Sequence, residues 1–409
     1  MVDMKRRTYY SQVWDELSSD KSMIFVSGPR QAGKTTLAKQ IARNCANTVY
    51  FNWDIASHRV RFFDNPDFFK EVERKDSSRP FIVFDEIHKH KDWKNYLKGV
   101  ADDCRDQYRF LVSGSGRLDT FQKGGDSLAG RYSQFHLWPF TYAELEGQGT
   151  TIDDFLKNPI AVWNRFSTGS EDTWKNLERF SGFPEPFLAG RRIGYQRWTN
   201  IYSKQLIRED IRNFSALQSV ADVETLYMLL PGKVGNPLSI PSLANDLKVS
   251  YNSIRNWLRL FETFYLSFAL SPWTDKISRS IRKERKLYIW DTPRIEDAAA
   301  RFENMVALEL YRAVTLWNDI GYGEFALHYI KNKERQEVDF LIANRRKPFL
   351  LIEAKINSDK PSPTLLKFQS KLHIPTVQLT ATGDRYRLIP NGNETTLVVS
   401  APRWFAHVP

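Results

Sequence analysis

The sequence predicts an α/β fold with several domains, on three observations. Apolar runs that suit buried parallel strands alternate with helical stretches up to about residue 145. A glycine-rich segment joins one of these runs to the helix that follows it. Near the carboxy terminus, two strand-like runs follow an amphipathic helix. The first part is therefore expected to be a doubly wound parallel sheet with helices on both faces.

The glycine-rich segment follows the apolar run Met23 to Val26 and opens a helical stretch from Thr36 to Asn44. It consists of Gly28, Pro29, Arg30, Gln31, Ala32, Gly33, Lys34, Thr35 and Thr36. Two glycines let successive amides point at a polyphosphate, and the helix adds its positive N-terminal end. Lys34 can reach the β- and γ-phosphates, and the Thr35 hydroxyl can ligate Mg²⁺. These residues predict a site for ATP or GTP.

An acidic pair lies at the end of a second strand. The run Phe81 to Phe84 suits a strand buried on both faces, and Asp85 and Glu86 follow it. Ligands gather at the carboxyl ends of parallel strands. We expect Asp85 to hold Mg²⁺ through water and Glu86 to polarise the attacking water. The alternative is a solvated acidic pair.

Two further features near the expected nucleotide site remain ambiguous. Ser113 and Ser115 follow the strand-like run Arg109 to Val112, so they are candidate contacts to the γ-phosphate or the lytic water; a Ser/Gly turn explains the same residues. Arg131, or Arg117, can act as an arginine finger on a neighbouring subunit. A surface ion pair is the alternative for Arg131.

Composition indicates a large, well-packed protein. The 409 residues are 42% apolar and 14% aromatic, which predicts two to four domains. Cys45 and Cys104 form no CxxC pattern, so neither a disulfide framework nor a cysteine zinc site is expected. Without an amino-terminal apolar segment or a membrane-length apolar run, we expect a cytoplasmic protein without membrane contact. His88 and His90 are expected at the surface.

The formal net charge of +11 favours a polyanionic partner. Nucleic acid is the leading candidate. An anionic membrane is the competing one, but neither terminus carries a basic amphipathic helix with a clear apolar face.

A helix-turn-helix pattern lies between Leu238 and Leu258. The first helix is short, and the second begins after Ser250 as N-cap and has apolar residues at helical spacing. Its exposed face would present Asn252, Arg255, Asn256 and Arg259, which makes Asn252, Arg255 and Arg259 candidate DNA contacts.

A cluster of cations follows the helix-turn-helix, between the strand-like run Phe264 to Ser271 and the expected strand Leu287 to Trp290. It consists of Lys276, Arg279, Arg282, Lys283, Arg285 and Lys286. A winged helix fits this order, with the cations of the wing on phosphates and the second helix in a groove. A protein-binding winged helix or a solvated hairpin remains as an alternative.

The carboxy-terminal part holds a second candidate catalytic site. Glu337 to Ile342 and Phe349 to Lys355 alternate as the two strands of a hairpin, so Glu353 and Lys355 share one face. Asp339 would meet Glu353 across the pair, and Glu303 on the preceding helix adds an acid. Asp339, Glu353 and the Ala354 carbonyl suit Mg²⁺, with Lys355 positioning or deprotonating water. An ordinary charged hairpin is the alternative.

These motifs together resemble a known family. The Gly28 to Thr36 segment, Asp85-Glu86, the Ser-Gly-Ser-Gly-Arg segment, Ala129 to Tyr132 and Trp138 to Glu144 resemble the prokaryotic AAA+ ATPases of the AAA_14 type. Leu206 to Asp210, Leu287 to Asp291 and the acidic hairpin resemble the DUF4143 region that accompanies them. Ala32 stands where a valine is common.

The resemblance implies an AAA+ ATPase (ASCE class), a winged helix and a restriction-endonuclease-like domain of the PD-(D/E)xK type. Asp339, Glu353 and Lys355 match the D…ExK pattern, and Glu303 matches the helix acid of such folds. The expected domains are a P-loop ATPase over 1–145, a helical lid and linker over 146–235, a winged helix over 236–290 and a nuclease-like domain over 291–409.

The sequence thus predicts an ATP-hydrolysing, Mg²⁺-dependent protein that remodels or translocates on duplex or branched DNA as a homo-oligomer such as a hexamer. In one alternative, the carboxy-terminal domain is an Mg²⁺-dependent DNA nuclease gated by ATP. In another, the chain is a nucleotide-dependent switch that binds protein partners.

Overall fold

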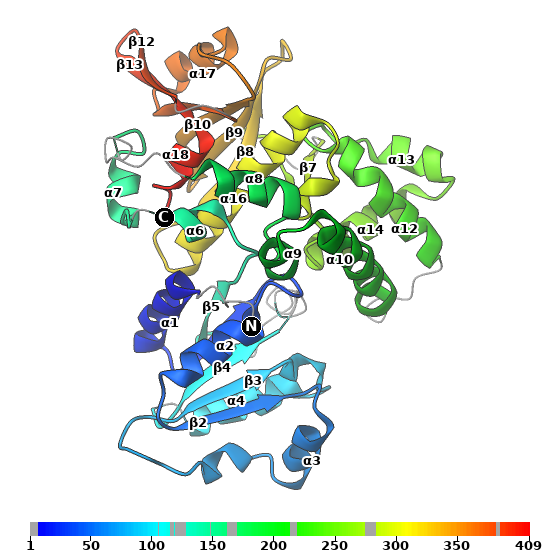
Figure 1. The fold of residues 1–409 in the computed structure, drawn as a ribbon, viewed down its shortest axis with the longest axis vertical. Helices are drawn as coiled ribbons and strands as arrows, with labels where there is room; N and C mark the ends of the chain where they lie inside the picture. Colours follow the sequence, from blue (N-terminus) through cyan, green and yellow to red (C-terminus); the bar gives the residue numbers. More distant parts are fainter. Residues whose placement is uncertain are drawn as a thin grey trace. The chain divides into compact units, whose positions relative to one another are not determined.

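The computed structural model describes residues 7–104, 106–114, 118, 128–147, 149–161, 170–212, 219–274, 284–381 and 385–409. The chain divides into two compact units between Pro139 and Phe140. Figure 1 shows the order of the elements along the chain. The first unit is slightly shorter than the expected ATPase domain of 1–145, and the other three expected domains fall within the second unit.

The first unit is built on a five-stranded sheet in the order β2-β3-β4-β1-β5, in which every neighbouring pair is parallel. The strands are β1 (Met23–Ser27), β2 (Thr48–Asn52), β3 (Phe81–Asp85), β4 (Arg109–Ser113) and β5 (Tyr132–His136). The other elements are α1 (Thr8–Asp20), α2 (Lys34–Arg43), α3 (Ala56–Asp64), η1 (Phe68–Glu71), η2 (Ile87–Lys89) and α4 (Trp93–Asp103). The predicted α/β fold with a parallel sheet is confirmed.

The central strands β1, β3 and β4 of this sheet are buried on both faces. All five residues of β1 and of β3 are buried, which explains their continuous apolar runs. Phe25, Phe84 and Phe110 pack with Trp93 and Leu97 of α4 in one core. On α1, the ring of Trp14 meets that of Phe81 edge to face, and α2 contacts β3 and β4. Helices therefore cover the sheet, as the alternating pattern predicts.

The second unit begins with helices. They are α6 (Tyr142–Glu146), α7 (Ile152–Lys157), α8 (Glu171–Phe180), α9 (Pro184–Ala189), α10 (Arg192–Gln205), the π-helix η5 (Leu206–Ile211), α12 (Val220–Leu229) and η6 (Leu230–Lys233). Helices α6, α7, α8 and α12 each begin at a Ser or Thr N-cap whose hydroxyl accepts a backbone N–H.

The helix-turn-helix forms as predicted. Helix α13 (Ile240–Leu247) ends at Lys248, which adopts a left-handed conformation with φ 54°, and α14 (Tyr251–Thr263) begins after Ser250. The Ser250 hydroxyl accepts the Ser253 N–H at 3.0 Å. The antiparallel pair β6 (Ser267–Leu270) and β7 (Lys286–Ile289) follows. Strand β6 is shorter than the expected run, and β7 begins and ends one residue earlier than expected.

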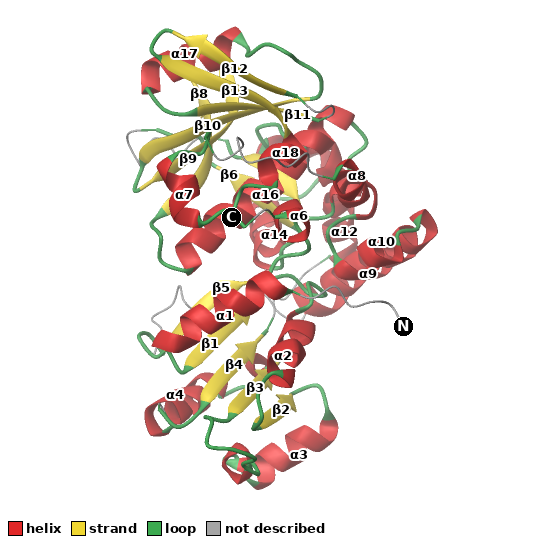
Figure 2. Cartoon of the chain, turned by 60° about the vertical axis from the view of Figure 1, so that its left-hand side comes forward, coloured by secondary structure: helices red, strands yellow, loops and turns green. Residues whose placement is uncertain are grey.

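The rest of the second unit carries a six-stranded mixed sheet in the order β12-β13-β11-β10-β9-β8 (Figure 2). The strands are β8 (Phe325–Lys331), β9 (Glu337–Asn344), β10 (Lys347–Lys355), β11 (Thr376–Thr380), β12 (Tyr386–Asn391) and β13 (Glu394–Ser400). The helical elements are η7 (Thr292–Arg294), α16 (Ala298–Asp319), α17 (Pro363–Leu372) and α18 (Ala401–Phe405). The predicted hairpin is β9-β10, and β10 pairs in parallel with β11.

No helix in the described parts of the chain is both long and apolar enough to cross a membrane.

Candidate functional site

The glycine-rich segment lies between β1 and α2 and requires both of its glycines. Gly28 has φ +138°, and a Cβ there would lie 2.2 Å from the carbonyl oxygen of Leu137. Gly33 has φ +100° and is the N-cap of α2. Side chains rarely adopt such angles, so only glycine gives the loop its tight curve without strain. The loop also receives support that the sequence did not indicate, because buried Arg7 donates to the carbonyls of Ala32 and Trp138, both at 2.7 Å.

Lys34 points back into this loop. Its ammonium donates to the carbonyl oxygens of Gly28 at 2.9 Å and Pro29 at 2.6 Å, and the residue is buried. The side chain is therefore positioned over the concave side of the loop, where a polyphosphate would receive its charge.

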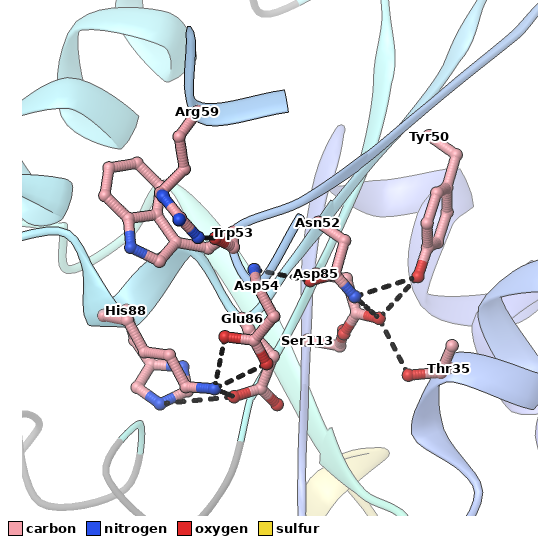
Figure 3. A network of polar contacts seen from close by, with 11 residues as sticks. Thr35, Tyr50, Asn52, Trp53, Asp54, Arg59, Asp85, Glu86, His88 and Ser113 are labelled. Carbon is pink, nitrogen blue, oxygen red and sulfur yellow. Dashed lines mark hydrogen bonds and ion pairs between the residues drawn. The ribbon is translucent and has the colours of Figure 1, made fainter. Parts of the chain in front are cut away.

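Asp85, at the carboxyl end of β3, is the centre of a hydrogen-bond network (Figure 3). Its Oδ2 accepts from the Thr35 hydroxyl at 2.7 Å, from the Tyr50 hydroxyl at 2.7 Å and from the Asn52 amide at 3.2 Å. Its Oδ1 accepts a short hydrogen bond from the Ser113 hydroxyl. Because burial and the Asp85 charge raise the pKa of Tyr50, the phenol stays protonated and donates.

The structure thus brings Thr35 and Asp85 together, as the sequence predicts, and adds Tyr50 and Asn52. The sequence could have indicated Tyr50 and Asn52, because Thr48–Asn52 has the composition of a strand and ends in a polar residue. β2 neighbours β3, so parallel pairing places Asn52 opposite Asp85 at the same edge of the sheet.

Glu86 is held in a different direction from Asp85. Its backbone is left-handed, with φ 59°, and its N–H donates to the Ser113 carbonyl at 2.9 Å. Its carboxylate lies 3.1 Å from the Lys89 ammonium and 3.8 Å from His88 Nε2. Figure 3 shows the Glu86 side chain beside Asp54 and His88, whereas Asp85 faces Thr35. His88 is buried, so the expectation of a surface histidine is wrong.

Lys89 links two carboxylates. It bonds both oxygens of Asp54 at 2.7 Å in addition to Glu86. Burial lowers the pKa of Lys89, but Glu86 and Asp54 outweigh it and raise the pKa above its usual value. Lys89 therefore stays charged and restrains the proposed catalytic glutamate.

The two ambiguous candidates near this site are only partly visible. Ser113 contacts Asp85, which agrees with a role at the nucleotide site, whereas Ser115 and Arg117 lie outside the described residues. Arg131 forms a bidentate pair with Asp102, at 2.6 and 3.1 Å. The structure thus shows the surface ion pair, and an arginine-finger role remains a prediction.

In the second unit, α14 presents the predicted polar face. Asn252, Arg255 and Arg259 are exposed, while Ile254, Trp257, Leu258 and Phe261 are buried. Arg255 lies over the Tyr251 ring at 6.0 Å. The face is therefore open to a partner.

The basic cluster after α14 does not behave as one surface. Lys276, Arg279, Arg282 and Lys283 lie outside the described residues. Arg285 is exposed, but its guanidinium bonds Glu262 at 2.8 Å and the Ala269 carbonyl at 2.6 Å. Lys286 is only 2% exposed, so it is not placed to contact DNA; β7 turns its side chain inward.

A third basic feature is a cavity of about 710 Å³ beside α8, α10 and α16. Arg179, Arg192 and Arg301 line it together with Tyr195 and one acid, Glu178. Glu178 pairs with Arg301 at 2.8 Å, which leaves Arg179 and Arg192 exposed at the opening. The lining carries a net positive charge.

The residues of the second catalytic candidate lie near one another on β9 and β10. Asp339 Oδ2 accepts the Ala354 N–H at 2.9 Å across β9 and β10. The Glu353 carboxylate lies 3.1 Å from the Lys355 ammonium and accepts the Ser362 hydroxyl at 2.8 Å. Burial raises the pKa of Glu353. Burial lowers the pKa of Lys355, but the charges of Asp339 and Glu353 outweigh burial and raise the pKa above its usual value. Lys355 is therefore charged and is no general base at neutral pH.

Lys286 enters the same cluster from β7. Its ammonium lies 2.6 Å from Glu337, 3.4 Å from Glu303 and 3.9 Å from Asp339. Glu303 also accepts the Tyr288 hydroxyl at 2.8 Å. Burial, followed by the Asp339 charge, raises the pKa of Glu303 to about 7. In the part of the chain that the structure describes, no group of three or more His, Cys, Asp or Glu side chains is arranged to hold a metal ion.

Comparisons with known proteins agree with the geometry of the first unit. Residues 20–146 match the family model described as "AAA domain". The matched segment includes the whole parallel sheet with its loop and acidic strand end. Residues 171–293 match the model of a domain of unknown function, DUF8612. The expected DUF4143 region is therefore a wrong assignment.

Curated relatives include uncharacterised proteins of Mycobacterium bovis and Mycobacterium tuberculosis, each 23% identical over 270 residues. These residues cover 66% of this chain and 54% of each relative, so the chain spans about half the length of the curated relatives it matches. A protein of Methanocaldococcus jannaschii is also 23% identical, over 67% of this chain and 61% of its own.

Among solved structures, a Walker-type ATPase of Pyrococcus abyssi is 16% identical, with a TM-score of 0.44 over 72% of this chain and 95% of that one. Drosophila ORC bound to DNA is 12% identical, with a TM-score of 0.30 over 69% of this chain and 91% of that one. These TM-scores are low, and they assign no function.

Proposed function

We propose that residues 20–146 form an AAA domain that binds ATP with Mg²⁺ and hydrolyses it. The observation that carries this proposal is the 2.7 Å contact between the Thr35 hydroxyl and Asp85, at the mouth of a loop that holds Lys34. In nucleotide hydrolases this pair lies at the metal, next to the β- and γ-phosphates.

The residues at this position fit Mg²⁺, which prefers hard oxygen ligands and few direct protein contacts. Thr35 and Asp85 supply a hydroxyl and a carboxylate, and Tyr50 and Ser113 orient the carboxylate by donating to it. Bound Mg²⁺ would neutralise charge that develops on the transferred phosphoryl group.

The remaining steps belong to side chains of the chain itself. Lys34 leaves the carbonyls of Gly28 and Pro29 and pairs with phosphate oxygens. Glu86 orients the attacking water and receives its proton, for which it must part from Lys89, 3.1 Å away. The ion pair therefore holds the domain in a state of low turnover until Glu86 is released.

We further propose that the second unit binds duplex or branched DNA, and that the protein works on it as an oligomer. Support comes from the net charge of +11, the exposed Asn252, Arg255 and Arg259 on the second helix of a helix-turn-helix, and the arginine-lined cavity. The β6-β7 pair after α14 fits the wing of a winged helix. In this function ATP hydrolysis drives remodelling of DNA or movement along it.

Nuclease activity is the second candidate, favoured by the approach of Asp339 to the β10 segment that carries Glu353 and Lys355. Lys286 argues against cleavage because it already neutralises the neighbouring acids. We therefore favour a domain that holds DNA without cutting it.

The decisive experiment measures ATP hydrolysis by the purified chain with and without linear and branched DNA, together with DNA retention in a gel. We expect hydrolysis that DNA accelerates, and no cleavage products with Mg²⁺ or Mn²⁺. Turnover that is indifferent to DNA, with no retained complex, would refute the DNA role while leaving the ATPase assignment intact. Products that vanish in Asp339→Ala would establish the nuclease instead.

A further inference from the structure

Lys286 is a buried lysine in a carboxylate cluster. Only 2% of the residue is exposed, and its ammonium is within 4 Å of Glu303, Glu337 and Asp339. These acids come from different elements, Glu303 from α16 and the other two from β9. The hairpin strand β7 carries the lysine to them from outside the six-stranded sheet.

The surrounding chain closes over this cation. The backbone of Lys286 forms an isolated antiparallel β-bridge with that of Pro237, and the Leu287 carbonyl accepts the Gly235 N–H at 3.1 Å. Gly235 has φ +74°, and a Cβ there would lie 3.1 Å from Glu303 Oε2. A glycine at this position lets the backbone pack directly against the acid. The cluster is thus covered by protein on the side from which β7 enters.

The charge of the lysine is secure. Burial alone lowers the pKa of Lys286, but Glu303, Asp339 and Glu337 outweigh it and raise the pKa to about 12. An ammonium at this position therefore does what a divalent metal does among carboxylates: it cancels their mutual repulsion. A second cation in the same place would be repelled.

We propose that the Lys286 ammonium is the resident cation of the cluster of Glu303, Glu337 and Asp339, in the place that a divalent metal takes in a nuclease site. Of the acids expected around Mg²⁺, Asp339 and Glu303 thus already face an ammonium, so this part of the site does not fit a divalent metal. The cluster is neutralised by an internal cation and needs no metal to fold.

The test uses the full chain without nucleotide, so its outcome does not depend on ATP hydrolysis. We compare Lys286→Met, which removes the charge and keeps the length, with Lys331→Met as the matched control. Lys331 pairs with Glu337 at 3.0 Å but is 35% exposed. Lys286→Met should lower the melting temperature by on the order of 10 °C near neutral pH, and Lys331→Met by much less.

A pH series separates charge from packing. The loss of melting temperature in Lys286→Met should become smaller as the pH falls from about 8 to about 5.5, because protonation of the carboxylates that have lost their cation removes their repulsion. Adding Glu303→Gln to Lys286→Met should restore part of the loss. A deficit that is equal at both pH values, with additive effects of the two substitutions, would overturn the proposal.

Should Lys286→Met fail to fold, Mn²⁺ titration of chains that keep Lys286 decides the matter. Asp85→Asn removes any metal that binds at the AAA domain, so the comparison is Asp85→Asn with and without Asp339→Asn. We expect identical, negligible Mn²⁺ binding in both. Binding that Asp339→Asn abolishes would show a metal in the cluster and overturn the proposal.

Discussion

The Thr35 hydroxyl donates a 2.7 Å hydrogen bond to the Asp85 carboxylate, although the two residues are fifty positions apart in the chain. Thr35 lies in the first turn of α2, after the glycine-rich loop, and Asp85 ends β3. The parallel sheet brings them together because both lie at the carboxyl edge of its strands.

Thr35→Ala should therefore affect the metal step more than nucleotide affinity. We expect ATP turnover to fall roughly 100-fold, with a steeper requirement for Mg²⁺, since one oxygen ligand is lost. The measurement is turnover against Mg²⁺ concentration. Thr48→Ala, whose hydroxyl bonds only the carbonyls of Ala42 and Cys45, serves as the control and should retain normal turnover.

Gly28→Ala should damage the loop beyond backbone strain alone. Gly130 also has a positive φ, +80°, but a Cβ there meets nothing within 4 Å. Gly130→Ala should cost about 1 kcal/mol of unfolding free energy, and Gly28→Ala clearly more, with loss of nucleotide binding. Denaturation and nucleotide titration of both variants test this. Equal costs would mean that the contact with Leu137 does not constrain the loop.

Lys89→Met should release Glu86. A partly exposed ion pair contributes up to about 1 kcal/mol, so basal ATP turnover should rise about two- to fivefold. Lys91→Met removes a charge from an exposed neighbour in the same segment and should change nothing. Steady-state turnover without DNA is the measurement. If Lys89→Met loses turnover as fully as Lys34→Ala does, Lys89 assists the reaction and the restraint model is wrong.

The stability of the second unit should fall as pH rises from about 4.5 to about 7. Burial raises the pKa of Glu309 to about 7, although Arg312 and the N–H groups of Tyr142 and Ala143 oppose the shift. A carboxyl with a raised folded-state pKa favours the fold while protonated and penalises it once ionised. Ionisation thus costs about 3 kcal/mol over this window.

Glu309→Gln keeps an oxygen for the Tyr142 N–H, 2.6 Å away in the wild type, and should flatten this dependence. Chemical denaturation of wild type and variant across that pH range provides the check. An unchanged slope would assign the pH dependence to other buried acids such as Glu303.

Arg255→Ala with Arg259→Ala should weaken DNA binding and reduce its salt dependence. If each arginine neutralises one phosphate, the slope of log affinity against log salt should decrease by about 1.8 for the pair. The control is Lys360→Ala with Lys371→Ala, which removes two exposed charges elsewhere in the second unit. This pair of substitutions should leave the affinity for DNA nearly unchanged. An equal effect of the two pairs would indicate attraction by net charge alone.

Local sequence determined much of the proposed nucleotide site. The loop from Gly28 to Thr35 and the end of β3 at Asp85 follow from short-range patterns, because glycine angles and buried strands are local properties. The same holds for the helix-turn-helix, which Ser250 and the spacing of Ile254, Trp257 and Phe261 specify. These elements form where the pattern predicts them.

Tertiary structure alone decided which charges meet. Tyr50 reaches Asp85 because β2 pairs with β3, and Lys89 meets Asp54, which lies 35 positions earlier in the chain. Lys286 reads as one cation of a basic run, yet the β7 register turns it into a carboxylate cluster. Side-chain direction and long-range pairing are set by packing, so a charge count cannot distinguish a surface contact from a buried counter-ion.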